Sequence, residues 1–448
     1  MKVLIFGLGI LGGGFASASF FLDQGDEVRI TDLRSETVLG GPLAILKHRG
    51  ALAICQEHRE EDFLWADMVI KNPAVSNTNP YLALAKRVET DMSYLFASPF
   101  LKNIQIIAIT GTKGKTTTAA AISHVLNSHD NESLQCGNMG ISGFSVLAEL
   151  QKRTKEAKPL PSYLVCELSS WQIRDIHASL RESLPEFRLV ILTSLFPDHL
   201  NTYTDFNEYK KDKWLLLTSK SKQVIISKEN LWEIKATTKI PTNRLFAIED
   251  VPEANKVEAR LRPAWAACRK LGLTPKAIIA AFNTFRGVPH RQEQVGVLHN
   301  ILFINDSSAT IPEAVTFSCE SCPWPYTLIC GGTDKNLAAD AMRSALADAS
   351  AIFMLDGSFT RNKLIPLLEK AGIPFHGPYN SMKDAVQQAF KFTREYQQKQ
   401  ESTQNFTIIL SPGAASFGMF KHEFDRGDQF KATVMEILNS EGIKLDLG

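Results

Sequence analysis

The feature that most constrains the fold is a glycine-rich turn between an apolar segment and a helix-forming segment. Residues 106–118 read IIAITGTKGKTTT, and the run Ile104–Ile109 has the composition of a buried strand. Ala119–Leu126 is rich in small residues and is typical of a helix. A strand, a glycine turn and Gly-Lys-Thr at the start of a helix form the arrangement that surrounds nucleotide phosphates. The chain is therefore predicted to contain an α/β sheet and to bind ATP.

Each residue type in this turn has a physical role. Gly111 and Gly114 let backbone N–H groups approach phosphate oxygens, and the helix N-terminus adds its partial positive charge. We expect Lys115 to neutralise the β- and γ-phosphates and the Thr116 hydroxyl to bind Mg²⁺. The leading glycine of the common G-x-x-x-x-G-K-[ST] pattern is replaced by Ile109. A glycine turn at such a junction can be purely structural, but Gly-Lys-Thr stands at the correct end for a nucleotide.

Composition narrows the remaining possibilities. A chain of 448 residues predicts about two to four domains, and 44% hydrophobic with 22% charged residues is typical of a soluble globular protein. A formal net charge of +1 argues against bulk attraction to nucleic acid or to an anionic membrane. The seven cysteines are scattered, and the single pair Cys319-x-x-Cys322 predicts no zinc or disulfide framework. Residues 3–22 are uncharged, but their five glycines disfavour a signal helix. We expect a cytoplasmic protein without membrane insertion or a nucleic-acid partner.

The N-terminal segment predicts a second nucleotide-binding turn. Strand Val3–Phe6 leads into G-x-G-x-x-G at residues 7–12, and the next strand, Val28–Thr31, ends at Asp32, 20 residues past the last glycine. Any nucleotide diphosphate could use the helix N-terminus that follows the turn, with Asp32 and Arg34 nearby. A βαβ unit without a ligand is the alternative.

Polar residues also follow strands in the centre of the chain. Glu167 follows the strand pattern Tyr163–Cys166, and His199 comes after Leu189–Leu192. Open α/β sheets bind their ligands at such strand ends. A carboxylate and an imidazole beside a phosphate loop could complete a Mg²⁺ site, although each taken alone is more often structural.

The C-terminal third repeats this organisation. Strands there alternate with helices, which predicts a mostly parallel sheet. The strand patterns are Leu302–Ile304, Thr327–Ile329, Ala351–Leu355 and Thr407–Leu410, each followed by polar or glycine residues. Three α/β domains are therefore expected.

Taken together, the motifs resemble those of the Mur ligases, ATP-dependent enzymes of peptidoglycan precursor synthesis. The matching segments are the N-terminal glycine turn, Thr110–Thr117, Gly137–Gly140, Glu167–Ser170, Asp198-His199, Pro289–Glu293, Asn305–Ser307 and Lys421…Asp425-Arg426-Gly427. The resemblance implies a Rossmann-like UDP-substrate domain at 1–97, a central P-loop ATPase-type domain at 98–287 and a C-terminal Rossmann-like domain at 288–448.

The resemblance also implies a set of site residues. ATP would contact Gly111, Thr112, Lys113, Gly114, Lys115, Thr116, Thr117, Arg291 and Asp306. The UDP-linked substrate would contact Ile10, Leu11, Asp32, Arg34, Asn138 and His199, and the incoming amino acid Thr310, Lys335, Ser416 and Glu423. The implied catalytic residues are Lys115, Glu167, His199 and Lys213, and the implied Mg²⁺ ligands Thr116, Glu167, His199 and Lys213 as a carbamate formed with CO₂. On pattern alone, Lys210, Lys211 and Lys213 would form a solvated basic face.

The pattern is most similar to that of the family members that add D-glutamate to UDP-N-acetylmuramoyl-L-alanine through an acyl phosphate. The resemblance implies ATP and two Mg²⁺ ions as cofactors, small-molecule partners only, a monomer, and a role in cell wall biogenesis, cell shape and cell division. A sister ligase that adds L-glutamate or another amino acid, and a non-catalytic nucleotide-binding paralogue, are the alternatives. Two departures bear on them: Ser308 stands where the family often has lysine, and 255–260 lacks the usual residues near adenine.

Overall fold

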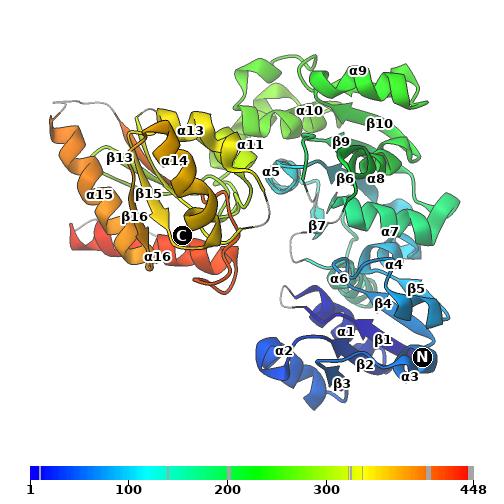
Figure 1. The fold of residues 1–448 in the computed structure, drawn as a ribbon. Coiled ribbons are helices and arrows are strands. Elements are labelled where there is room, and N and C mark those ends of the chain that lie inside the picture. Colours follow the sequence, from blue (N-terminus) through cyan, green and yellow to red (C-terminus); the bar gives the residue numbers. More distant parts are fainter. Residues whose placement is uncertain are drawn as a thin grey trace. The chain divides into compact units, whose positions relative to one another are not determined.

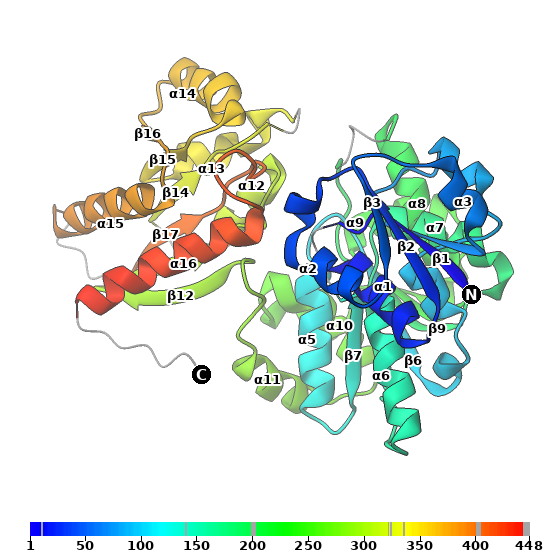
Figure 2. The same cartoon turned by 90° about the horizontal axis from the view of Figure 1, so that it is seen from below.

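The structure is a computed structural model that describes residues 1–9, 12–138, 141–198, 203–320, 322, 325–334, 337–399 and 405–441. The chain divides into two compact units, Met1–Phe285 and Arg286–Gly448. The first unit carries two sheets and the second carries one, with helices on the sheet faces (Figures 1 and 2). The predicted α/β class is confirmed, while the boundaries at 97/98 and 287/288 stay predictions.

The first sheet is parallel throughout, in the order β3-β2-β1-β4-β5. Its strands and the α-helices between them are β1 Lys2–Phe6, α1 Gly13–Asp23, β2 Glu27–Asp32, α2 Glu36–His48, β3 Leu52–Cys55, α3 Glu60–Trp65, β4 Met68–Lys71 and β5 Val88–Glu89. The central strand β1 is apolar and buried on both faces, as a parallel strand between two helix layers must be. The predicted strand, glycine turn and helix are present at the N-terminus.

The second sheet is also parallel, in the order β11-β10-β9-β6-β8-β7. Its strands and α-helices are β6 Gln105–Thr110, α5 Lys115–Asn127, β7 Ser133–Gly137, α6 Gly143–Lys155, β8 Tyr163–Glu167, α7 Ser170–Leu180, β9 Phe187–Leu192, α8 Phe206–Thr218, β10 Ser221–Ile226, α9 Lys228–Thr237, β11 Leu245–Ala247, α10 Arg262–Lys270 and α11 Pro275–Thr284. The strand order reverses at β6, which lies between β8 and β9. Ligands of open α/β sheets bind at such a switch point, so the fold places a site at the carboxyl end of β6.

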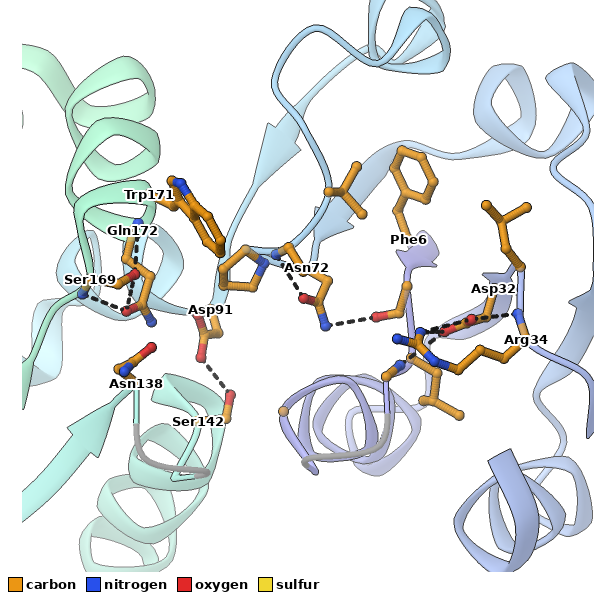
Figure 3. Close-up of a pocket in the computed structure, with 18 of the residues that line it drawn as sticks. Phe6, Asp32, Arg34, Asn72, Asp91, Asn138, Ser142, Ser169, Trp171 and Gln172 are labelled. Carbon is orange, nitrogen blue, oxygen red and sulfur yellow. Dashed lines mark hydrogen bonds and ion pairs between the residues drawn. The ribbon is translucent and has the colours of Figure 1, made fainter. Parts of the chain in front are cut away.

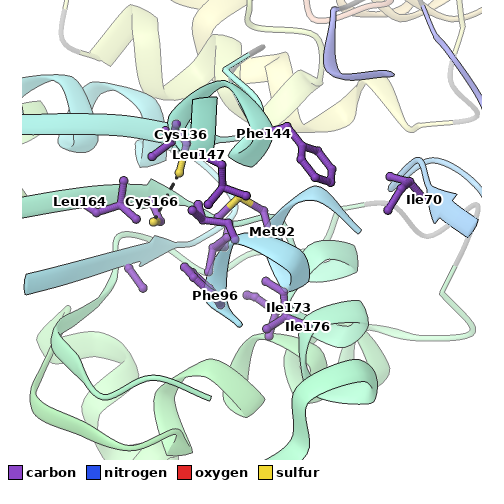
Figure 4. Close-up of a cluster of buried hydrophobic side chains, with 14 of the residues drawn as sticks. Ile70, Met92, Phe96, Cys136, Phe144, Leu147, Leu164, Cys166, Ile173 and Ile176 are labelled. Atoms are coloured by element: carbon purple, nitrogen blue, oxygen red, sulfur yellow. Dashed lines mark hydrogen bonds between the residues drawn. The ribbon is translucent and has the colours of Figure 1, made fainter. Parts of the chain in front are cut away.

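A continuous hydrophobic core links these two sheets within the first unit (Figure 4). Helix α4, Asp91–Phe96, contacts both α6 and α7, and its Met92 and Phe96 are buried in this core. The buried ring of Phe144 in α6 lies 5.0 Å, centroid to centroid, from the rings of Phe20 and Phe21 in α1. The sheets of residues 1–285 are therefore held together by apolar packing as well as by the chain connection.

The second unit contains one sheet in the order β12-β13-β17-β14-β15-β16. Among the described strands of this sheet only β12 pairs antiparallel, so the sheet is mostly parallel, as predicted. Its strands and α-helices are β12 Glu293–Leu298, β13 Ile301–Asn305, α12 Pro312–Glu320, β14 Tyr326–Cys330, α13 Arg343–Asp348, β15 Ala351–Leu355, α14 Ile365–Ala371, β16 His376–Tyr379, α15 Met382–Lys399, β17 Phe406–Leu410 and α16 Glu423–Ser440. Among the helices described, none is both long and apolar enough to cross a membrane.

Candidate active site

The predicted phosphate loop connects β6 to α5. Gly111–Gly114 form the loop, and Lys115–Thr117 form the first turn of α5. Gly111 and Gly114 have φ values of +148° and +82°, a region that favours glycine. Two residues that follow β9 hold the loop: Ser194 Oγ accepts from the Lys113 N–H at 2.9 Å, and Thr193 Oγ1 donates to the Lys113 carbonyl at 2.5 Å. Sequence reasoning missed both residues, although their position directly after a buried strand is a signal for a site.

Two lysine side chains converge on the same loop. Lys115 Nζ donates to the carbonyls of Gly111 and Thr112 at 2.9 and 3.1 Å, and Lys213 Nζ donates to the Gly111 carbonyl at 3.0 Å. Lys213 is only 1% exposed. Burial, with a smaller contribution from Lys115, lowers the pKa of Lys213 well below its usual value. A neutral amine is a nucleophile, which is the state that carbamate formation requires.

The expectation of a solvated basic face on α8 is wrong for two of its three lysines. Lys213 and Lys210 are buried, and Lys210 pairs with Glu233, while Lys211 alone is exposed. Lys213 also lies over the ring of Tyr209, with Nζ 4.5 Å from the ring centroid. The prediction was wrong because closely spaced lysines usually lie on a helix face that is exposed to water. Here α8 packs beside the phosphate loop, and this packing buries part of that face.

Three predicted residues from different elements meet next to the loop. Glu167, the last residue of β8, is buried and accepts from Thr116 Oγ1 at 2.7 Å and from Asn138 Nδ2 at 3.1 Å. The end of β7 can lie this close to Glu167 because residue 137 is glycine: a Cβ there would lie 1.9 Å from the Glu167 carbonyl oxygen. The structure thus brings together the residue at the start of α5, the end of β8 and the residue after β7.

The oxygens of Thr116 and Glu167 fit a Mg²⁺ ion, which prefers hard oxygen ligands and keeps phosphate oxygens and water in its shell. Within the described part of the chain, no cluster of three or more His, Cys, Asp or Glu residues could hold a metal by itself. Substrate phosphates and water would add further oxygen ligands to such an ion. His199, predicted as a further ligand, lies outside the described residues.

A pocket of about 440 Å³ lies in the first unit, between the carboxyl edge of the first sheet and the start of α7 (Figure 3). The predicted residues Asp32, Arg34 and Asn138 line it, together with Trp171 and Gln172 on the α7 side. The latter two were missed by sequence reasoning. The pair Ser169-x-x-Gln172 is a capping box that starts α7, and that pattern could have indicated that Gln172 lies at a helix N-terminus.

Asp32 organises the glycine turn of this pocket. Its buried carboxylate accepts from the Gly9 N–H at 3.0 Å and from the Arg34 N–H at 2.9 Å, and the Arg34 guanidinium lies 3.2 Å from it. The Asp32 side chain therefore fixes the turn as well as lining the pocket. The two predicted contacts of the same turn, Ile10 and Leu11, lie outside the described residues.

In the second unit, Asp306 follows β13 and is buried. Its carboxylate accepts from the hydroxyls of Ser318 at 2.5 Å and Ser411 at 3.0 Å and from the Gln292 N–H at 3.1 Å. Burial raises the pKa of Asp306 to about 6, and the hydrogen bonds it accepts and, to a smaller extent, the charge of Arg291 oppose that rise. The two predicted ATP residues of this unit therefore interact with each other.

The predicted amino-acid residues of the second unit lie at the carboxyl ends of β13 and β17 and at the start of α16. Ser416 is buried, and its hydroxyl has no hydrogen-bond partner among the described residues, whereas the Glu423 carbonyl accepts from Ser307 Oγ at 2.6 Å. Thr310 lies in the loop after β13, and Lys335 lies outside the described residues. The Arg426 guanidinium, which is completely buried, donates to the Ser307 carbonyl at 2.8 Å and so ties α16 to this loop.

Comparison with known proteins agrees with this arrangement. Residues 109–260 match the model of the Mur ligase middle domain. The chain is 33% identical to the UDP-N-acetylmuramoylalanine–D-glutamate ligase of Borreliella afzelii (strain PKo), with 97% of each chain covered. It is 28% identical to the enzyme of the same name from Treponema pallidum (strain Nichols), over 96% of this chain and 97% of the relative. The fold is similar to that of a UDP-N-acetylmuramate–alanine ligase from Thermotoga maritima, with a TM-score of 0.58, 17% identity, and 98% and 100% of the two chains covered.

The chain belongs to the Mur ligase family, as its motifs predicted. It is therefore an ATP-dependent ligase that forms amide bonds. Within the family, it is similar along nearly its whole length to the ligases named for D-glutamate.

Proposed function

We propose that this protein joins D-glutamate to the alanyl carboxylate of UDP-N-acetylmuramoyl-L-alanine, with cleavage of ATP to ADP and phosphate. The observation that carries the proposal is that one unit contains two sites. Thr116, Glu167 and Asn138 meet beside a phosphate loop, and a pocket with a Rossmann-type glycine turn lies in the same unit. Relatives that carry this substrate in their name cover 97% of the chain. One unit thus carries a site for a nucleoside triphosphate and a site for a UDP-linked acid. This combination fits an enzyme in which ATP activates the carboxylate of that acid.

In the proposed reaction, the alanyl carboxylate attacks the γ-phosphorus of ATP, and the bond to the β-γ bridging oxygen breaks to give an acyl phosphate and ADP. The loop amides between Gly111 and Gly114 and the Lys115 ammonium stabilise the negative charge on the phosphoryl oxygens. The amine of D-glutamate then attacks the acyl carbon, loses a proton, and phosphate leaves. Lys115 donates to loop carbonyls in the structure, so nucleotide binding would redirect its protons toward phosphate.

Mg²⁺ held by Thr116 and Glu167 would supply a Lewis acid that neutralises charge on the transferred phosphoryl group. The buried neutral amine of Lys213, next to the Gly111 carbonyl, is suited to attack CO₂ and lose a proton, which converts it into an anionic carbamate. Such an anion would offer oxygen ligands to a second ion. In the second unit, Arg291 and Asp306 are proposed to contact ATP, and Thr310, Ser416 and Glu423 the amino acid.

The test is ADP release by the purified protein with ATP, Mg²⁺ and UDP-N-acetylmuramoyl-L-alanine, assayed separately with D-glutamate, L-glutamate and other amino acids. We expect release with D-glutamate only. Release with L-glutamate alone would identify a sister ligase, and no release with any amino acid would identify a non-catalytic paralogue. Ser308, where the family often has lysine, makes this comparison the decisive one for the amino acid. The soluble, charged substrates fit a cytoplasmic enzyme.

A further inference from the structure

A buried ion pair joins the two walls of the pocket. Lys71, the last residue of β4, and Asp175, in α7, have Nζ and Oδ2 2.8 Å apart, and their side chains are only 4% and 3% exposed. Neither residue lines the pocket or belongs to the predicted site. The pair lies within the unit Met1–Phe285 and connects the first sheet to a helix of the second.

The lysine organises the wall formed by the first sheet. Lys71 Nζ also donates to the Val75 carbonyl at 2.9 Å, which folds the segment after β4 back over the strand end. The neighbouring Asn72 accepts from the Ala74 N–H at 3.0 Å and donates to the Gly7 carbonyl at 3.2 Å. Asn72, Ala74, Val75 and Gly7 all line the pocket, as Figure 3 shows for Asn72. Lys71 thus connects the glycine turn and this segment to Asp175.

The aspartate organises the opposite wall. Asp175 lies one turn after Trp171 and Gln172, the two pocket residues in the first turn of α7. Its second oxygen accepts from Asn77 Nδ2 at 2.6 Å, so the end of β4 and the segment after it both contact α7 through Asp175.

Stability alone is a weak reason for such a pair. Two buried charges lose their hydration, and well-packed apolar side chains of similar volume often stabilise a protein equally well. A charge pair with additional hydrogen bonds does fix the relative position of the groups that it joins, because each bond is directional. The pair is therefore better suited to hold two walls at one spacing than to add free energy of folding.

We propose that Lys71 and Asp175 are positioning residues that set the spacing between the two walls of the UDP-substrate pocket. This inference rests on the proposed function for the identity of the ligand. It assigns no chemical step to either residue.

The test is isothermal titration calorimetry of UDP-N-acetylmuramoyl-L-alanine and, separately, of ATP, on the wild type, Lys71→Met, Asp175→Asn and the double variant. We expect each single change to weaken binding of the UDP-linked substrate by about tenfold, with ATP binding unchanged. The double variant should bind no more weakly than the weaker single one, since the two residues act as one contact. Asp62→Asn is the matched control: Asp62 is also buried and pairs with Arg29 at 2.7 Å, but this pair joins α3 to β2 and does not connect the two walls.

Single variants that melt at a lower temperature but bind the UDP-linked substrate with unchanged affinity would overturn the inference. Equal loss of affinity for both ligands, or strictly additive effects in the double variant, would also overturn it. If Asp175→Asn does not fold, Asn77→Ala replaces it, because Asn77 is exposed and its substitution removes only the second contact of Asp175. We then expect a smaller loss of affinity that is specific to the UDP-linked substrate. Unchanged affinity for that substrate would overturn the inference. Failure of the wild type itself to bind the UDP-linked substrate would overturn the proposed function and this inference with it.

Discussion

The side chain of Lys213 illustrates how much the chemistry of one residue depends on its surroundings. In water a lysine amine is protonated at neutral pH, but burial beside the phosphate loop and near Lys115 lowers the pKa of Lys213. The helix that carries it also carries Lys210, which is buried but pairs with Glu233. Two lysines three residues apart therefore have different roles, one at the loop and one in an ion pair.

We expect Lys213→Ala to lower turnover by at least about 10²-fold, because the oxygens of the proposed carbamate are lost from the site of phosphoryl transfer. Short carboxylic acids added to the assay should restore part of the activity, since they can place a carboxylate in the cavity. Steady-state ADP release measures both effects. Lys210→Ala is the control and should retain most activity. Full activity of Lys213→Ala would refute the carbamate.

Asp306 predicts a pH dependence of stability. Its pKa is raised by burial to about 6, above the usual value for an aspartate, so the folded state binds this proton more tightly than the unfolded state. The resulting stability is fully present below about pH 4 and is lost as the pH rises to about 6, with an upper limit of about 3 kcal/mol.

Urea unfolding of the wild type and Asp306→Asn at pH 4.5, 5.5 and 6.5 measures this dependence. The free energy of unfolding of the wild type should fall relative to that of the variant across the series. The difference between the two proteins isolates Asp306 from the other titrating groups. Parallel pH profiles would contradict the assignment.

At the scale of elements, the loop between β6 and α5 depends on one glycine more than on the other. A Cβ at Gly111 would lie 2.1 Å from Thr193 Oγ1 and 3.0 Å from the Ser194 nitrogen, whereas a Cβ at Gly114 meets Thr193 only at 3.5 Å. Both glycines have positive φ, so both substitutions strain the backbone, but only Gly111 also has its space filled.

We therefore expect Gly111→Ala to weaken ATP binding by at least about tenfold, because the loop must move away from the residues that hold it. Gly114→Ala should cost about 1 kcal/mol of stability and weaken ATP binding less. Titration of ATP and thermal melting of both variants separate the two costs. Equal effects on ATP binding would contradict the role of the Thr193 contact.

At the scale of the whole molecule, the shared core of residues 1–285 predicts how the protein unfolds. Phe144 in α6 contacts the rings of Phe20 and Phe21 in α1 and of Tyr94 in α4, and is fully buried. Removal of a buried aromatic ring from such a cluster costs about 3–5 kcal/mol. The two units have separate cores, since no core cluster among the described residues includes side chains of both.

Scanning calorimetry of the full chain should accordingly show two transitions, one for each unit. Phe144→Ala should lower the temperature of one transition and leave the other unchanged. Phe303→Ala, in the sheet of the second unit, is the matched substitution and should affect the other transition. If Phe144→Ala splits the transition of the first unit in two, its sheets fold independently.

The sequence by itself determined the local elements and the chemistry of the loop. Alternating apolar and helical segments predicted parallel α/β sheets, because each strand must be covered on both faces. Gly111, Gly114 and Lys115 stand together in the chain, so their spacing alone predicted a phosphate site. The ordered motifs predicted the family because they depend on residue identity at short spacing.

The tertiary structure decided which distant residues meet and which charges are buried. The contact of Thr116 with Glu167 spans 51 residues and depends on the order of strands in the sheet. The loop contact of Thr193 depends on the pairing of β6 with β9, while the burial of Lys213 and the pairing of Lys71 with Asp175 depend on helix packing. No local pattern encodes these features, because a side chain's exposure and partners are set by segments far away in sequence.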